Sequence, residues 1–338
     1  MKDKFILLVA LVVVFVINLF ADKLDPYFHT IIIFVGINII LATSLNLING
    51  YTGQFSLGHA GFMAIGAYVS LGLSTYFAPV FNSMFGTGSI GTSVTFLILM
   101  LIAGLSAGIV GLLVGVPSLR LKGDYLAIVT LGFAEIIRVS IQGMDFIGAA
   151  QGFRGVYIYD NGIRSLEMLP DVTGIGYKFY SVPSYTDFFW VFAMTAICIF
   201  FVNNLMNSTY GRAFVAVKDD EVAAEAMGIN TTKFKVIAFV SGAFFAGVAG
   251  SLYGHFVTFV TPEDFNFLRS VEILVMVILG GMGSMIGVVI AAVLLTILPE
   301  VLRGVSEYRM IVYSLLLVIL MLTRPQGLFG VKLLKSKK

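Results

Sequence analysis

Long apolar stretches separated by short polar breaks run along the whole 338-residue chain. A helix that crosses a bilayer needs about 20 largely apolar residues, so each stretch near or above about 18 residues predicts a span. The pattern predicts about ten spans, near residues 5–21, 28–48, 54–78, 92–116, 124–144, 187–205, 234–256, 268–280, 285–302 and 308–323. The chain is therefore predicted to form one all-α, polytopic membrane domain over residues 1–338.

Two breaks between predicted spans are short and rich in Asn or Gly. Residues 46–54 separate the second and third spans, and residues 280–284 separate the eighth and ninth. Either junction is compatible with a broken or re-entrant helix. The charged start and apolar residues 5–20 resemble a secretory signal, but residues 21–26 offer no small-x-small cleavage site, so we expect an uncleaved first span.

Composition excludes a water-soluble fold. Apolar residues make up 58% of the chain and charged residues only 12%, against about 45–50% and about 25% in ordinary soluble domains. The 21 basic and 19 acidic residues are dispersed, so no nucleic-acid partner is predicted. The single cysteine, Cys198, excludes a disulfide within the chain.

Basic residues indicate how the spans are oriented. Placing the N-terminus inside puts most Lys and Arg residues of the connections in the cytoplasm, and an even span count then places both termini there. Residues 145–186 become an outer loop and residues 206–233 a charged cytoplasmic loop. Five spans lie on either side of the outer loop, so any internal duplication would be an inverted 5+5 repeat.

The cytoplasmic loop contains signals for a short helix. Asp219 or Asp220 can cap the first amides, and Glu221 suits the positive end of the helix dipole. Gly228 provides a left-handed residue that ends the helix. An amphipathic helix of about two turns results, either as a linker or as a knob that a partner protein grips in a groove.

Four segments resemble one transporter family. Residues 225–230, Glu-Ala-Met-Gly-Ile-Asn, resemble the Glu-Ala-Ala-type coupling loop of ABC importer permeases, and residues 45–62 resemble the signature of the LivM branch of the branched-chain amino acid permease family. Residues 279–284 and 324–330 are also similar to family segments. One departure is Ala149, which stands where the family commonly has the second glycine of a Thr-Gly-Gly-x-x-Gly stretch.

The resemblance implies a type II ABC importer-like permease in a bacterial cytoplasmic (inner) membrane. Its expected partners are a LivH-like permease, two cytoplasmic ABC ATPases and an extracytoplasmic substrate-binding protein. The expected cargo is a branched-chain or other hydrophobic amino acid. No Gly-x-x-x-x-Gly-Lys-[Ser/Thr] loop occurs, so ATP and Mg would bind the partner ATPases, with no cofactor and no ATPase site in this chain.

Two groups of residues are candidates for function. Coupling to the ATPases is assigned to the cytoplasmic loop, at Arg212, Asp220, Glu221, Glu225, Ala226 and Gly228. The candidate translocation path consists of polar or small residues stranded among apolar ones, at Asn46, Gln54, Ser56, Gly58, His59 and Glu135. The alternatives are that Asn46 and Gln54 bond local backbone, that His59 bonds a neighbouring helix, and that Glu135 pairs with Arg138 three residues on.

Three other functions remain open from the sequence. The first is a permease of the same superfamily for urea, short amides or sugars. The second is an ion-coupled secondary transporter, which needs ionisable relays, although only Glu135 and Glu272 clearly lie within predicted spans. The third is a membrane enzyme, although His29, His59 and His255 form no ligand-spaced motif.

Overall fold

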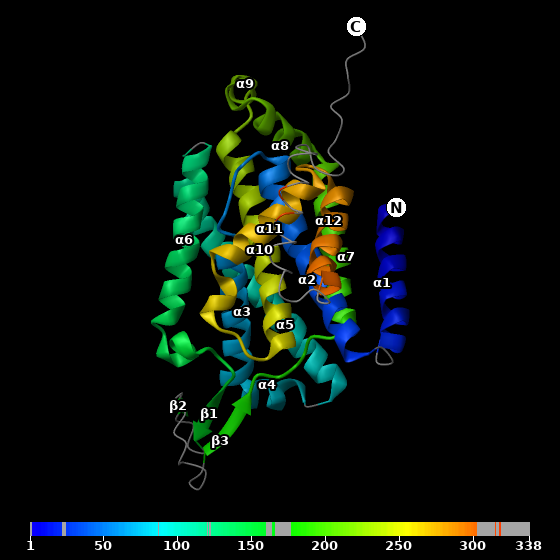
Figure 1. The fold of residues 1–338 in the computed structure, drawn as a ribbon, viewed down its shortest axis with the longest axis vertical. Coiled ribbons are helices and arrows are strands. Elements are labelled where there is room, and N and C mark those ends of the chain that lie inside the picture. The colour runs from blue at the N-terminus through cyan, green and yellow to red at the C-terminus, as the bar shows by residue number, and fades with distance from the viewer. Residues whose placement is uncertain are drawn as a thin grey trace.

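The computed structural model describes residues 2–21, 25–86, 88–119, 121, 123–159, 164–165, 177–302, 315 and 318, which form a helical bundle with a small sheet at one end (Figure 1). The α-helices are α1 (Lys2–Ala21), α2 (Pro26–Asn46), α3 (His59–Tyr76), α4 (Ala78–Phe85), α5 (Ser89–Ser118), α6 (Asp124–Gln142), α7 (Phe188–Met206), α8 (Thr209–Asp219), α9 (Glu221–Ala226), α10 (Thr231–Val257), α11 (Phe267–Gly280) and α12 (Met285–Val301). The short helical turns are η1 (Leu47–Tyr51), η2 (Asp145–Ile147), η3 (Ala149–Gln151) and η4 (Pro262–Phe265).

The helices make this a multi-pass membrane protein, but the prediction of ten spans is not confirmed. Among the described residues, four helices are long and apolar enough to cross a bilayer, or up to six if two bent helix pairs each count as one span. Apart from residues 315 and 318, the predicted span 308–323 lies outside the described residues. At 1.5 Å per residue, the 14 residues of α11 extend only about 21 Å, which is short of the roughly 30 Å hydrocarbon core.

Small residues bring the central helices into close contact. An added Cβ at Gly250 of α10 would overlap the carbonyl oxygen of Met63 on α3, and one at Gly111 of α5 would lie 2.6 Å from the Ala243 Cβ on α10. Lipid does not drive helices together as water does, so association depends on such close backbone approach. Each of these glycines has a second glycine four residues on, at Gly254 and Gly115, and this spacing is a packing signal.

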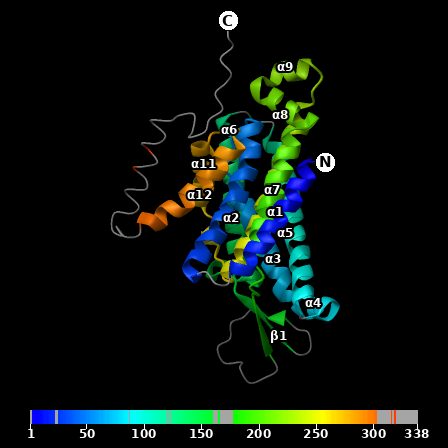
Figure 2. The same cartoon turned by 90° about the vertical axis from the view of Figure 1, so that its right-hand side faces the viewer.

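The two long connections lie at opposite ends of the bundle (Figures 1 and 2). Helices α8 and α9 project from the end at which α1 begins, while the strands β1 (Gly155–Tyr159), β2 (Arg164–Ser165) and β3 (Tyr177–Ser181) lie at the other end. This arrangement agrees with the prediction that residues 145–186 and 206–233 face opposite sides of the membrane.

The sheet corrects the prediction of an all-α fold. Its strands are antiparallel in the order β2-β1-β3, with Tyr157 opposite Phe179. Aromatic and β-branched residues favour extended backbone, and they alternate in β1. A separate two-residue bridge between Phe153 and Val260 ties the segment before β1 to the loop after α10, so the outer segment is fixed to the bundle.

Candidate transport path and coupling segment

The junction between α2 and α3 is a broken helix. After Asn46 the chain winds into the wider π-turn η1, and Gly53 then takes the left-handed φ of +68°. The Asn49 side chain holds the loop, because its Oδ1 accepts from the Ser56 amide at 3.2 Å and its Nδ2 donates to the Ser56 carbonyl at 3.3 Å. Residues 52–58 are therefore not helical, and α3 begins at His59 rather than near residue 54 as predicted.

A second break lies beside the first. Between α11 and α12, Gly281 and Gly283 have φ angles of +97° and +88°, which glycine adopts without a Cβ clash. The Gly283 amide donates to the Asn46 Oδ1 at 2.9 Å. Asn46 therefore bonds a distant backbone group, and the predicted local role of its side chain is wrong.

The start of α3 is held by side chains from three other helices. The His59 Nε2 lies 2.8 Å from the Ser44 Oγ of α2, which confirms the alternative that His59 bonds a neighbouring helix. The Thr130 Oγ1 of α6 accepts from the Leu57 amide at 3.1 Å, and the Ser270 Oγ of α11 accepts from the Ala60 amide at 3.2 Å. Polar groups of α2, α3, α6 and α11 thus meet at this junction.

Several buried polar atoms at the junction lack a hydrogen-bond partner. Among the described residues they include the Asn46 Nδ2, both amide atoms of Gln54 and the His59 Nδ1. An unsatisfied buried polar atom costs about 1–3 kcal/mol, so such a group calls for a functional or solvent explanation. Ser56 is fully buried, and an added Cβ at Gly58 would lie 2.5 Å from the Thr130 carbonyl oxygen.

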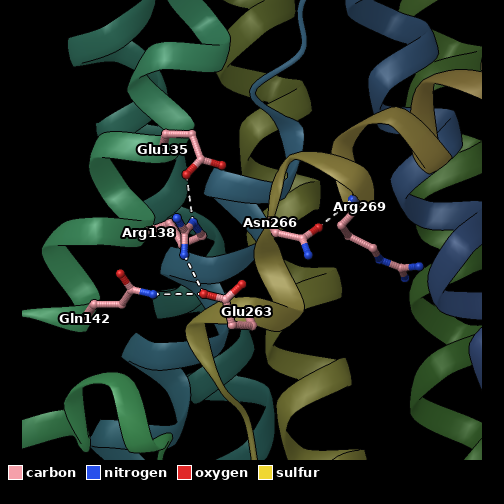
Figure 3. Close-up of polar contacts among 6 residues, drawn as sticks. All are labelled: Glu135, Arg138, Gln142, Glu263, Asn266 and Arg269. Carbon is pink, nitrogen blue, oxygen red and sulfur yellow. Dashed lines mark hydrogen bonds and ion pairs between the residues drawn. The ribbon is translucent and has the colours of Figure 1, made fainter.

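Glu135 lies in a different place from the other candidate path residues. Its carboxylate accepts from the Arg138 Nε at 2.7 Å, so the predicted pairing of these two residues is confirmed (Figure 3). Arg138 also donates to Glu263 at 2.8 Å, and Gln142 donates to the same Glu263 oxygen at 3.0 Å. This cluster joins α6 to η4, which precedes α11.

The predicted coupling helix is present as α9. The Asp220 Oδ1 accepts from the amides of Val222 at 2.9 Å and Ala223 at 3.1 Å, which confirms the cap. Gly228 has a φ of +84°, and the Ile229 amide donates to the Ala224 carbonyl at 3.0 Å. These contacts complete the glycine-terminated helix end that the sequence predicts.

Sequence reasoning missed α8, which precedes α9 and contains Arg212 as an exposed residue. The Ser208 Oγ accepts from the Tyr210 amide at 3.1 Å and caps the start of α8. Serine is a preferred helix N-cap, so Ser208 could have predicted that a helix begins here.

Helix α9 is tied to the start of α10 and exposes an apolar tip. The Lys235 ammonium lies 2.6 Å from the Glu221 carboxylate, and the Thr231 Oγ1 donates to the Glu225 carboxylate at 2.7 Å. Val222 and Met227 are 69% and 83% exposed, and Ala226 is also exposed. Bulky apolar side chains on a projecting charged helix are typical of a protein-binding knob.

Lys218 joins the candidate coupling segment, helices α8 and α9, to the broken helices. Its Nζ, at the end of α8, donates to the Gly50 carbonyl in η1 at 2.7 Å. An added Cβ at Gly53 would lie 3.0 Å from the Lys218 Cγ, and one at Gly283 would lie 3.6 Å from the Lys218 Nζ. The Lys218 side chain therefore bonds one break and lies close to the other, and no sequence signal marked Lys218 as functional.

Comparison with known proteins identifies the family. Residues 27–322 match the family described as branched-chain amino acid transport system / permease component. The chain is 36% identical over 313 residues to the LivM permease protein of the high-affinity branched-chain amino acid transport system of Salmonella typhimurium, covering 86% of this chain and 67% of that protein.

More distant relatives come from both branches of the family. The chain is 25% identical over 342 residues to a probable LivM of Methanocaldococcus jannaschii, covering 89% of this chain and 93% of that protein. It is 26% identical over 298 residues to LivH of Escherichia coli K12, covering 86% of this chain and 90% of that protein. No solved structure matches the chain. The chain belongs to the branched-chain amino acid transport permease family, and it is similar to LivM-type members.

Proposed function

We propose that this chain is a membrane-spanning permease subunit of an ABC importer that moves branched-chain or other hydrophobic amino acids into the cytoplasm. The observation that carries the proposal is the contact between Lys218 and Gly50, which are 168 residues apart in sequence. It connects α8, which leads through α9 into the segment that resembles an ABC coupling loop, to the place where α2 breaks. A movement of α8 and α9 is therefore transmitted to the end of α2 through this hydrogen bond.

The mechanism follows from this connection. A cytoplasmic ATPase grips α9 at Val222 and Met227, where Glu225 is also exposed, while Arg212 is exposed on α8. Movement of α8 displaces the Lys218 ammonium, which changes the spacing between η1 and the break at Gly283. In many transporters broken helices form the substrate site, and rocking of one group of helices against another exposes that site alternately to either side.

The assembly follows the family pattern. A LivH-like permease pairs with this chain, two cytoplasmic ABC ATPases bind ATP and Mg, and an extracytoplasmic protein delivers the substrate. The membrane is the bacterial inner membrane, with both termini and α9 in the cytoplasm and the sheet outside. For the fold, we propose that the chain has ten spans arranged as an inverted 5+5 repeat.

Ion coupling has less support. Glu135 pairs with Arg138 at 2.7 Å and Glu272 pairs with Arg269 at 3.0 Å, so each carboxylate already has a structural partner that accounts for its presence in the bundle.

Reconstitution tests the proposal. The permease, a LivH-like permease, the two ATPases and the binding protein are placed together in liposomes loaded with ATP, and entry of labelled leucine is measured. We expect uptake that stops when the binding protein is omitted or when ATP is replaced by a non-hydrolysable analogue. Uptake driven instead by a proton or sodium gradient without ATP would contradict the proposal, and preferential uptake of urea or a sugar would contradict its choice of substrate.

A further inference from the structure

A polar cavity of about 420 Å³ lies between α2, α10, α11 and α12. It involves the first half of α11 and the last turns of α12, near the end of the bundle at which α2 begins. Its volume is within the range of about 300–1,000 Å³ for small-molecule sites. The cavity is separate from the junction around His59, whose residues do not line it.

Arg269 provides a fixed cation in this cavity. Its NH1 donates to the Glu272 carboxylate at 3.0 Å, and its NH2 donates to the Asn38 Oδ1 at 2.8 Å. Asn38 is held in turn, because its Nδ2 donates to the Thr296 Oγ1 at 2.8 Å. A guanidinium has five N–H donors, so further donors are available to a carboxylate. Figure 3 shows Arg269 pointing away from the cluster around Arg138.

Carboxylates make the cavity negative overall. Asp264, Glu272 and Glu300 line it together with the single cation Arg269. The Asp264 carboxylate accepts from the Thr261 amide at 2.7 Å, and the Glu300 carboxylate accepts from the Tyr27 hydroxyl at 2.6 Å. No group of three or more His, Cys, Asp or Glu in the described part of the chain is placed to hold a metal ion. The charges therefore suit a ligand that brings an ammonium group.

Apolar side chains complete the lining. Phe34, Tyr253, Met276 and Leu295 border the same cavity, and Phe34 and Tyr253 have ring centroids 6.1 Å apart. We propose that the cavity binds a zwitterionic amino acid with an apolar side chain. Arg269 receives the α-carboxylate, Glu272 and Glu300 attract the ammonium, and the apolar residues contact the side chain. This proposal rests on the proposed function, and it places a substrate site within this subunit.

Protection from chemical labelling tests the site in the complete transporter without its binding protein. Thr296→Cys places a thiol at the cavity wall, and its reaction with a small water-soluble thiol reagent is followed by mass spectrometry of the peptide. Leucine is expected to slow labelling by the factor 1 + [L]/Kd, about tenfold when leucine is at about nine times its Kd. The analogues 4-methylpentanoic acid and 3-methylbutylamine, each lacking one charge, should protect at least several-fold less.

Two arginine substitutions provide a matched pair. Arg269 and Arg138 are 19% and 18% exposed, and each pairs with a Glu three residues away. We expect Arg269→Gln, combined with Thr296→Cys, to abolish protection by leucine and Arg138→Gln to leave it unchanged. Equal loss in both variants would overturn the proposal, as would equal protection by the amine alone.

The uptake assay separates failure of the site from failure of the proposed function. If the Thr296→Cys transporter imports leucine but leucine does not slow its labelling, the cavity is not the site. A residue 296 that never reacts in the complete transporter would show that another subunit covers the cavity, which also overturns the proposal. If Thr296→Cys prevents assembly, Pro299→Cys probes the same wall, with the same outcomes.

Discussion

The Lys218 ammonium on α8 lies 2.7 Å from the carbonyl oxygen of Gly50, inside the π-turn that ends α2. The carbonyls at the end of a helix lack intrahelical partners, and a charged donor satisfies such a group better than a neutral one. This relationship places the end of α8 against α2, the most buried of the candidate spans that the structure describes.

Removing the Lys218 ammonium is expected to uncouple ATP hydrolysis from transport. Lys218→Met keeps an unbranched side chain against Gly53 but leaves the Gly50 carbonyl without its donor. Leucine uptake by reconstituted transporter should fall about tenfold or more, corresponding to about 1.4 kcal/mol of lost coupling, while ATP hydrolysis continues. Lys233→Met, at an exposed position in the first turn of α10, is the control. Normal uptake per ATP in Lys218→Met would remove this contact from the mechanism.

Charge reversal at Glu225 tests the docking surface of α9. Glu225→Lys should lower uptake and substrate-stimulated ATP hydrolysis together, because a mismatched charge at an interface costs several kcal/mol. The Thr231 hydroxyl donates to this carboxylate, so Glu225→Gln, which keeps an acceptor, separates the hydrogen bond from the charge. Glu225→Gln should have the smaller effect. A well-expressed Glu225→Lys protein with normal coupling would leave α9 as a linker.

Substitution of two glycines tests whether the glycines serve close helix packing or only helix flexibility. Gly250→Ala should destabilise the permease by about 1–3 kcal/mol, because its Cβ would overlap the Met63 carbonyl of α3 and a packed interface resists added volume. Gly72→Ala, where a Cβ meets open space, should change stability by less than about 1 kcal/mol, in the stabilising direction. Thermal unfolding of the purified protein in detergent measures both, and equal stability of the two variants would exclude the packing interpretation.

The family departure at Ala149 predicts a stabilising reversion. Ala149 has a φ of +45°, and the left-handed region costs a non-glycine residue about 1–2 kcal/mol. Ala149→Gly should therefore raise the free energy of unfolding by about 0.5–1 kcal/mol, after the greater freedom of glycine in the unfolded chain is subtracted. Ala150 does not have a left-handed backbone, so Ala150→Gly should lower the free energy of unfolding. A lower melting temperature for Ala149→Gly would contradict this account.

Apolar stretches and local capping signals were sufficient to predict most of the helices and α9. The Asp220 cap and the Gly228 end depend on residues within one turn, so sequence spacing alone determines them. The sheet was missed because its strands are short and lie in a polar connection, where the apolar period is weak.

The contacts of the candidate site depend on residues far apart in the chain. Asn46 bonds Gly283 and Lys218 bonds Gly50, and no local pattern relates such pairs. The cavity around Arg269 was missed for the same reason, since the sequence places Arg269 at the start of the predicted span 268–280 and gives no sign that Asn38 lies beside it. Only the positions of α2, α11 and α12 in the fold bring these charges together.

Helix α2 forms hydrogen bonds with residues that are synthesised much later than α2 itself, and this order matters for membrane insertion. Asn46 enters the membrane early, but its partner Gly283 is translated 237 residues later, which at about 5–20 residues per second takes roughly 12–47 s. During that interval Asn38 and Asn46 lack their contacts with α11, α12 and the turn between these helices. Two buried asparagines of α2 therefore stay without their final partners until the C-terminal helices are made.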